Sequence, residues 1–156
     1  MLRAKPKGAA VQKLNPITDF SEITATNRIT ATCHGWRAKC LQRLIRIELP
    51  VPQTVALPAA TVRAIAAGQP VDCAAILAHF GPEPLVSVRP SPENPDWGGP
   101  ATILNIGFNA ARHDRLVQPH GQAAADALYL RFVQGYAIHV ARLDPDMFEE
   151  IGRAHV

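Results

Sequence analysis

Apolar residues recur at helical spacing in several parts of the chain. The clearest case predicts a helix over residues 122–142, whose apolar stripe consists of Tyr129, Phe132, Val133, Tyr136 and Val140. A second helix is predicted over residues 38–47, where apolar and basic residues occupy different faces. Shorter helices are predicted at residues 58–67, between Pro58 and Gly68, and after Asp72 as far as Gly81, the latter burying Ile76, Leu77 and Phe80.

Short apolar runs elsewhere predict β-strands. Residues 85–89 form one such run, residues 102–107 form the returning strand, and residues 54–57 form a further short strand. Residues 90–100 contain four prolines and the pair Gly98-Gly99, which excludes regular structure between the first two strands. The sequence therefore predicts an α+β fold in which short strands, including a hairpin, pack with several helices.

The first part of the chain has a different character. Residues 1–30 have no sustained period, and residues 1–46 carry nine Lys or Arg but only two acids. These basic residues are scattered and have few aromatics among them, so we interpret residues 1–34 as a poorly ordered basic segment rather than a nucleic-acid-binding arm. No continuous apolar region follows the basic residues at the N-terminus, so the sequence does not support a secretory signal. No apolar run approaches the ~18–20 residues that span a bilayer, and we expect a cytoplasmic protein.

The three cysteines do not form a metal or disulfide pattern. Cys33, Cys40 and Cys73 are odd in number and lack C-x-x-C spacing, which is typical of a reducing compartment. A site built on Cys33, His34 and Cys40 would lack a fourth ligand at suitable spacing. We predict no metal site within this chain.

Arg89 is the first candidate for ligand binding, since it ends a predicted strand and begins the Pro/Gly-rich loop. A guanidinium matches phosphate oxygens with a rigid fork of donors, and glycines such as Gly98 and Gly99 let backbone N–H groups approach a phosphate. The residues alone leave an alternative open, in which Arg89 pairs with Glu93 or Asp96. The residues also leave more than one role for Trp97. Its ring could stack on a base, shield the phosphates, or act as a hydrophobic plug that anchors the loop, and we prefer the plug.

Several segments in order resemble one enzyme family. Residues 84–109 resemble the nucleotide-binding region of pyruvate, phosphate dikinase and phosphoenolpyruvate synthase. They read PLVSVR, then a loop, then ATILNIGFN. Downstream, YLRFVQGY at residues 129–136 resembles that family's YRRFIQMY helix, and residues 146–149 resemble the segment after it. Upstream, LPVPQ at residues 49–53 resembles its MPIPQGF turn. The resemblance covers roughly residues 35–150.

This resemblance implies the first part of an ATP-grasp nucleotide-binding domain. In the family, that domain uses ATP and Mg²⁺ to phosphorylate a histidine on a second domain, and a third domain passes the phosphoryl group to pyruvate. The implied ATP-binding residues are Arg89, Arg37, Gly98, Gly99 and Thr102. Arg37 stands where the family has a lysine, the loop has lost a second basic residue, and Ala101 replaces an aspartate. These departures mark a divergent site.

The resemblance also bears on the limits of the chain. We expect residues 35–150 to be the front of the domain and residues 151–156, IGRAHV, to be a translated sequencing adapter. The metal carboxylates, the carrier histidine and the pyruvate site would then lie elsewhere in a longer parent, in which oligomers could form, and this chain alone would be inactive. The alternative is a stand-alone module on the same scaffold that binds a nucleotide, or an acidic partner through Arg37, Lys39, Arg43 and Arg46.

Overall fold

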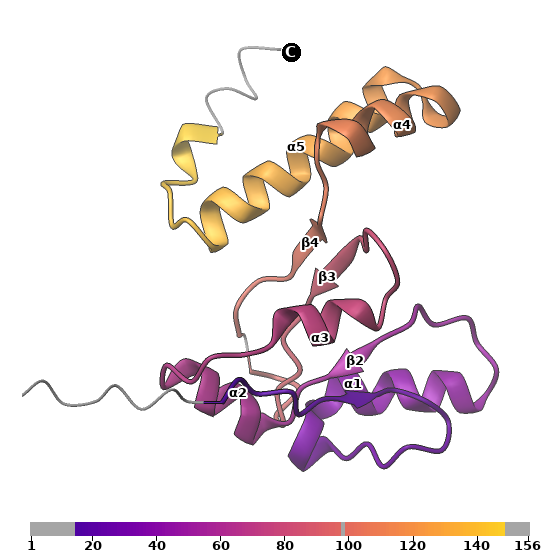
Figure 1. The fold of residues 1–156 in the computed structure, drawn as a ribbon, viewed down its shortest axis with the longest axis vertical. Coiled ribbons are helices and arrows are strands. Elements are labelled where there is room, and N and C mark those ends of the chain that lie inside the picture. The colour runs from indigo at the N-terminus through magenta and orange to yellow at the C-terminus, as the bar shows by residue number, and fades with distance from the viewer. Residues whose placement is uncertain (1–14, 98, 149–156) are drawn as a thin grey trace, which may run out of the picture.

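The computed structural model describes residues 15–97 and 99–148. Figure 1 shows a lower body and an upper pair of helices, joined by a small hairpin of strands. The elements follow in the order β1 (Ser21–Glu22), α1 (Ala31–Arg46), β2 (Val55–Ala56), α2 (Ala59–Ala66), α3 (Cys73–Ala78), β3 (Val86–Val88), β4 (Ile103–Ile106), α4 (Ala110–His120) and α5 (Gln122–His139).

The described strands form two small antiparallel sheets. In the first, β1 pairs with β2, so that Ser21 faces Ala56. In the second, β3 pairs with β4, with Val86 opposite Ile106 and a register irregularity before Val88. Five helices accompany these two sheets in the described residues, so the predicted α+β class is confirmed, as is the strand pair on either side of the Pro/Gly-rich loop.

A small core lies under α1. Ile23, Ile29, Ala38 and Ala56 form its buried cluster, against which Leu41 and Ile45 pack. Gln42 is fully buried there, and its amide group donates hydrogen bonds to the carbonyls of Thr24 and Asn27. Residues 15–34 thus contribute a strand, two core isoleucines and the start of a helix. This corrects the expectation of a poorly ordered segment for residues 15–34, while residues 1–14 and 151–156 lie outside the described residues.

The helices differ from the prediction at their boundaries. α1 begins at Ala31 rather than at residue 38, because the Thr30 hydroxyl accepts a hydrogen bond from the Cys33 N–H and caps an additional turn. Asp72 caps α3 as predicted, with Oδ1 accepting from the Ala75 N–H at 2.9 Å. Leu77, however, is 39% exposed and not buried. Helix α4, which Asn109 caps, was not predicted.

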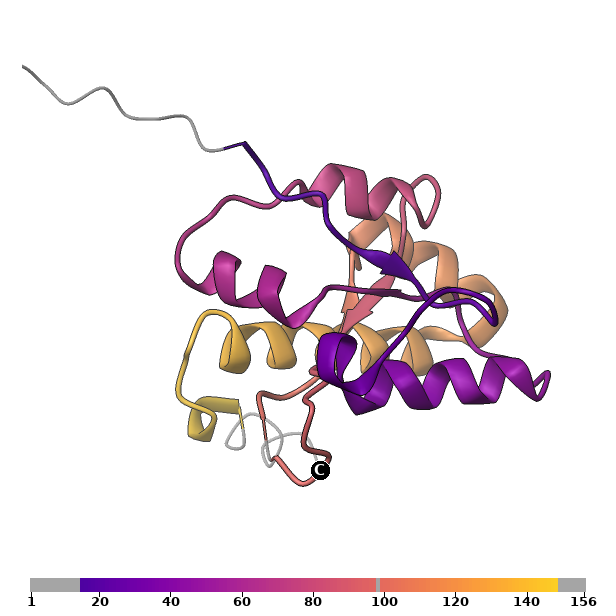
Figure 2. The same ribbon diagram turned by 90° about the horizontal axis from the view of Figure 1, so that it is seen from below.

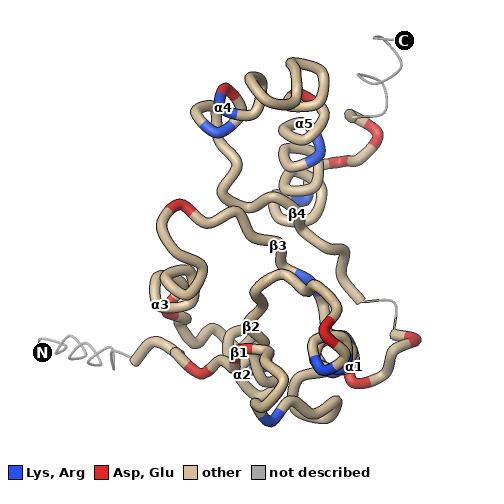
Figure 3. The backbone as a smooth tube through the Cα atoms, turned by 90° about the vertical axis from the view of Figure 1, so that its right-hand side faces the viewer, with Lys and Arg blue, Asp and Glu red and all other residues tan. Residues whose placement is uncertain are grey.

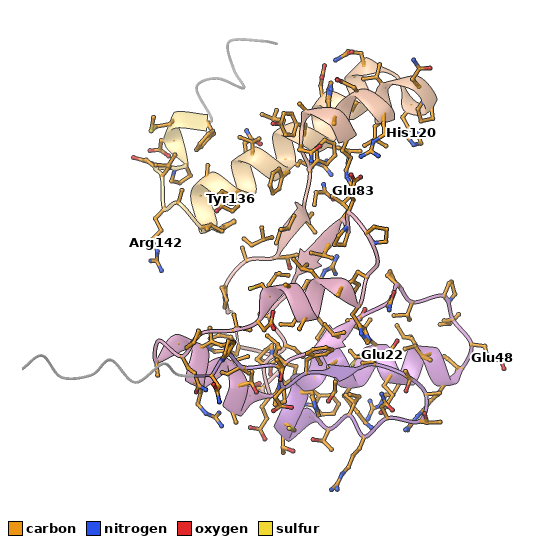
Figure 4. All side chains as sticks on the ribbon, in the orientation of Figure 1. Glu22, Glu48, Glu83, His120, Tyr136 and Arg142 are labelled. Atoms are coloured by element: carbon orange, nitrogen blue, oxygen red, sulfur yellow. The ribbon has the colours of Figure 1, made fainter. Side chains whose placement is uncertain are left out.

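The α4–α5 pair stands apart from the core under α1. Figure 1 shows both helices above the β3–β4 hairpin, and α5 packs against α4 and β4. The predicted helix is confirmed as α5, but much of its apolar stripe is uncovered: Val133, Tyr136 and Val140 are each more than 40% exposed. In Figure 4, Tyr136 lies on α5 and Glu83 lies below the helix pair.

Of the helices in residues 15–97 and 99–148, none has the length and apolar character needed to cross a bilayer.

A candidate anion site between the kink of α1 and the loop after β3

A kink in α1 prepares one wall of the site. Gly35 has φ 80° and ψ 167°, so the first turn of α1 ends there and a new helical segment starts at Trp36. Such backbone angles are almost restricted to glycine. A Cβ at this position would overlap the carbonyl oxygen of Ser91, so the glycine also allows the loop after β3 to come into contact with the helix.

Four hydrogen bonds attach that loop to the kink. Ser91 Oγ donates to the His34 carbonyl at 2.7 Å and accepts from the Ala38 N–H at 3.0 Å. The Trp36 N–H donates to the Pro92 carbonyl at 2.8 Å, and Arg37 Nε donates to the Pro90 carbonyl at 3.0 Å. Figure 2 shows the loop between β3 and β4 beside the start of α1. These contacts bring together segments that are more than 50 residues apart in the sequence.

A cavity of about 610 Å³ lies between the two attached segments. Arg37 and Cys40 line it from α1, and Gly99 and Thr102 line it from the loop and the approach to β4. Both tryptophans and several loop prolines complete the lining. Three of the five predicted ATP-binding residues, Arg37, Gly99 and Thr102, therefore face one cavity.

The other two predicted residues have different positions. Arg89 directly follows β3 and precedes Pro90, which lines the cavity, but the exposed side chain of Arg89 is not itself part of the lining. No ion pair joins Arg89 to Glu93 or Asp96 in residues 15–97 and 99–148, so the structural alternative for this arginine finds no support. Gly98 lies outside the described residues.

The electrostatics of α1 favour an anion. The helix carries Arg37, Lys39, Arg43 and Arg46 and no acidic residue, and Figure 3 shows basic positions at α1. Lys39 and Arg46 donate to the carbonyls of Ile29 and Ala25, and the Arg43 guanidinium lies 5.3 Å from the centre of the Trp36 ring. Among the described residues no carboxylate pairs with any of these cations, so α1 keeps a net positive charge, and Arg37 is the cation of this helix that lines the cavity.

Arg37 has donors left for a ligand. A guanidinium carries five N–H donors, and in the described part of the chain only Nε of Arg37 is engaged, with the Pro90 carbonyl. This bond fixes the side chain against the loop and leaves both Nη groups for other acceptors. The Arg37 side chain can thus present a planar pair of donors to a phosphate or carboxylate.

Sequence reasoning missed Ser91, which forms two of the four hydrogen bonds between loop and helix. A single hydroxyl in a proline-rich loop gives no signal of a contact more than 50 residues away. Gly35 was equally hard to interpret from the sequence, because its role depends on contact with Ser91, a partner that the sequence does not identify.

A second polar cluster joins α4 to α5. His113 Nε2 lies 2.7 Å from Asp126 Oδ1 and Nδ1 lies 3.2 Å from Asp114 Oδ1. The hydrogen bond to Asp126, followed by that to Asp114, raises the pKa of His113, and the same contact lowers the pKa of Asp126. His113 on α4 thus links this helix to Asp126 on α5.

Comparisons with known proteins add no further support: no family model, no curated protein and no solved structure matches this chain.

Proposed function

We propose that the cavity between α1 and the loop binds the phosphates of ATP. The observation that supports this most strongly is the attachment of the loop to the kink, which places Arg37, Gly99 and Thr102 around one cavity. The resemblance to pyruvate, phosphate dikinase implies these same residues as ATP ligands. The uncompensated positive charge of α1 supplies the attraction that a polyphosphate needs.

Each residue has a role that follows from its chemistry. Arg37 offers its Nη groups to phosphate oxygens. Arg89 does not line the cavity, but it directly precedes Pro90, which does, and in this proposal its exposed guanidinium reaches the phosphates from the end of β3. Gly99 brings backbone to the cavity, and the Thr102 hydroxyl is a further donor. Phosphoryl transfer depends mainly on positioning and charge neutralisation, which such a set of donors provides.

In this proposal the chain is the front part of the nucleotide-binding domain of a cytoplasmic, ATP-dependent phosphotransferase. The parent protein would phosphorylate a carrier histidine and form phosphoenolpyruvate from pyruvate. The described residues contain no group of three or more His, Cys, Asp or Glu that could hold a metal ion. The proposal places the Mg²⁺ ligands and the transfer steps on other parts of that parent.

Calorimetric titration of ATP into the 156-residue chain tests the phosphate site. Arg37→Ala and Arg89→Ala remove the two proposed cations. Arg115→Ala is a matched control, because Arg115 lies on α4 and pairs with Glu83. A charge-assisted hydrogen bond contributes about 1.5–3 kcal/mol. We therefore expect each of the first two variants to weaken ATP binding by roughly tenfold or more, and the control to bind as the wild type does.

Two results would contradict the proposal. One is a wild-type chain with no measurable affinity for ATP or for tripolyphosphate. The other is equal ATP affinity in the wild type, Arg37→Ala and Arg89→Ala.

A further inference from the structure

The two tryptophans of the chain, Trp36 and Trp97, both line the cavity. They come from different segments, one from the kink of α1 and the other from the loop after β3. Phosphate recognition needs donors and positive charge and makes no use of an indole ring. Aromatic faces beside a basic groove are typical of sites that stack nucleobases.

Trp36 is the more constrained of the two. Its backbone N–H is bonded to the Pro92 carbonyl, its side chain is partly buried, and the Arg43 guanidinium occupies a position over its ring. These contacts are a sufficient explanation for an indole at this position, which fixes the kink against the loop. Trp36 therefore forms a wall of the cavity, and the Arg43 guanidinium lies over its ring.

Trp97 is different because packing accounts for only part of its ring. The six-membered ring lies against Gly99, where a Cβ would overlap it, so the indole anchors the loop at that point. Yet Trp97 is 58% exposed, and it is one of the residues that line the cavity. A large aromatic surface left open beside a cation-bearing helix has no structural role in the described residues.

We propose that the exposed part of Trp97 stacks on the base of the nucleotide whose phosphates Arg37 holds. This inference rests on the proposed function, and it adds a contact with the base to the phosphate contacts of that proposal. A cavity of about 610 Å³ is within the range of small-molecule sites, roughly 300–1,000 Å³. Trp97 thus combines the plug and the stacking role: one part of its ring holds Gly99, and the remainder meets the base.

The test compares ATP with tripolyphosphate, which carries the phosphates without the base. Both are titrated calorimetrically into the wild type, Trp97→Ala and Trp97→Phe. Stacking on an aromatic side chain contributes about 1–3 kcal/mol per base, so we expect the wild type to bind ATP about tenfold more tightly than tripolyphosphate. Trp97→Ala removes this advantage, Trp97→Phe keeps most of it, and affinity for tripolyphosphate is the same in all three.

Fluorescence gives a second measurement on the same pair of ligands. In Trp36→Phe, Trp97 is the one remaining indole of the chain. We expect ATP to quench its emission and tripolyphosphate to leave it unchanged.

The outcomes separate this inference from the proposed function. Binding of ATP and tripolyphosphate with equal affinity in the wild type would overturn the stacking role and leave the phosphate site standing. An equal loss of both ligands in Trp97→Ala would show that Trp97 only anchors the loop, and would also overturn it. Absence of binding by either ligand to the wild type would overturn the proposed function itself.

Discussion

The α1 region and the α4–α5 pair are held in place by different means. Around α1, side chains such as Lys39 and Gln42 donate hydrogen bonds to carbonyls of distant segments, over a small core that contains Ile29. Between α4 and α5 the contacts are aromatic and ionic, with Phe108 stacked on Tyr129 at 5.3 Å. This difference is consistent with a candidate site at α1, because hydrogen bonds between α1 and the loop after β3 hold donors such as Arg37 in place there.

Each of the two regions contains a glycine with nearly the same backbone angles, but the surroundings of the two glycines differ. Gly35 in α1 has φ 80° and ψ 167°, and Gly121 between α4 and α5 has φ 81° and ψ 159°. Ser91 lies directly against Gly35, whereas nothing lies within 4 Å of a Cβ at Gly121. A substitution at Gly121 therefore measures the cost of backbone strain alone, whereas the same substitution at Gly35 measures that strain together with the loss of the loop contact.

We expect Gly35→Ala to have the largest effect on stability. Alanine at either position introduces backbone strain that costs about 1–3 kcal/mol. At position 35 the alanine Cβ would also overlap the Ser91 carbonyl, and we expect this to detach the loop. Urea unfolding should show a loss of about 5 kcal/mol for Gly35→Ala and about 2 kcal/mol for Gly121→Ala. Equal losses in the two variants would mean that the loop contributes nothing to holding α1.

Core truncation should have the next largest effect. Ile29 is 2% exposed and Leu130 on α5 is 53% exposed. Ile29→Ala removes a buried side chain and leaves a cavity, which costs about 3 kcal/mol, whereas Leu130→Ala should change stability by less than about 0.5 kcal/mol. Thermal unfolding of both variants measures this difference, and a large loss for Leu130→Ala would show that the surface of α5 is covered.

Ser91→Ala should destabilise the protein less. The variant removes the donor to the His34 carbonyl and the acceptor of the Ala38 N–H, which together are worth about 2 kcal/mol. Ser87→Ala on β3 is the control, since Ser87 is exposed and its hydroxyl forms no hydrogen bond within the described residues. If urea unfolding gives the same stability for both variants, Ser91 does not hold the loop on α1.

The smallest effect is a pH dependence of the α4–α5 pair. The raised pKa of His113 means that its contribution to stability is complete below the unfolded pKa, about 6.5, and is lost as pH rises through the higher folded value. The lowered pKa of Asp126 gives a contribution that is lost as pH falls below about 4. The urea concentration at the unfolding midpoint of the wild type should therefore decrease as pH is raised from about 6.5 through the folded pKa of His113.

His113→Gln is the matched variant for this measurement, because glutamine keeps a hydrogen-bonding group and cannot take up a proton. Its midpoint should change less over the same pH range. A slope identical to that of the wild type would assign the pH dependence to other groups.

The sequence predicted local elements better than their contacts. Periodicity located α5, and the position of the loop followed from its prolines and glycines. Helix α4 was missed because its polar composition and Pro119 conceal the period, although Asn109 supplies an ordinary cap. The early start of α1 was missed because the hydrophobic period does not extend across Gly35.

The candidate site was predictable only in part, for a physical reason. The loop was identifiable from its prolines and glycines, and Arg37 was implied only by the resemblance to the dikinase family. Their attachment depends on Ser91 and on backbone carbonyls, and backbone acceptors are common to every residue and leave no mark in a sequence. The exposure of Tyr136 on α5 was equally hidden, because a helical stripe does not reveal whether anything packs against it.

The most direct test of the phosphate site is an NMR titration of the ¹⁵N-labelled chain with tripolyphosphate. We expect amide shifts at Trp36, Arg37 and the loop residues around Ser91 and Gly99, and unchanged resonances in α4 and α5. Shifts concentrated on the α4–α5 pair, or no shifts at millimolar tripolyphosphate, would contradict it.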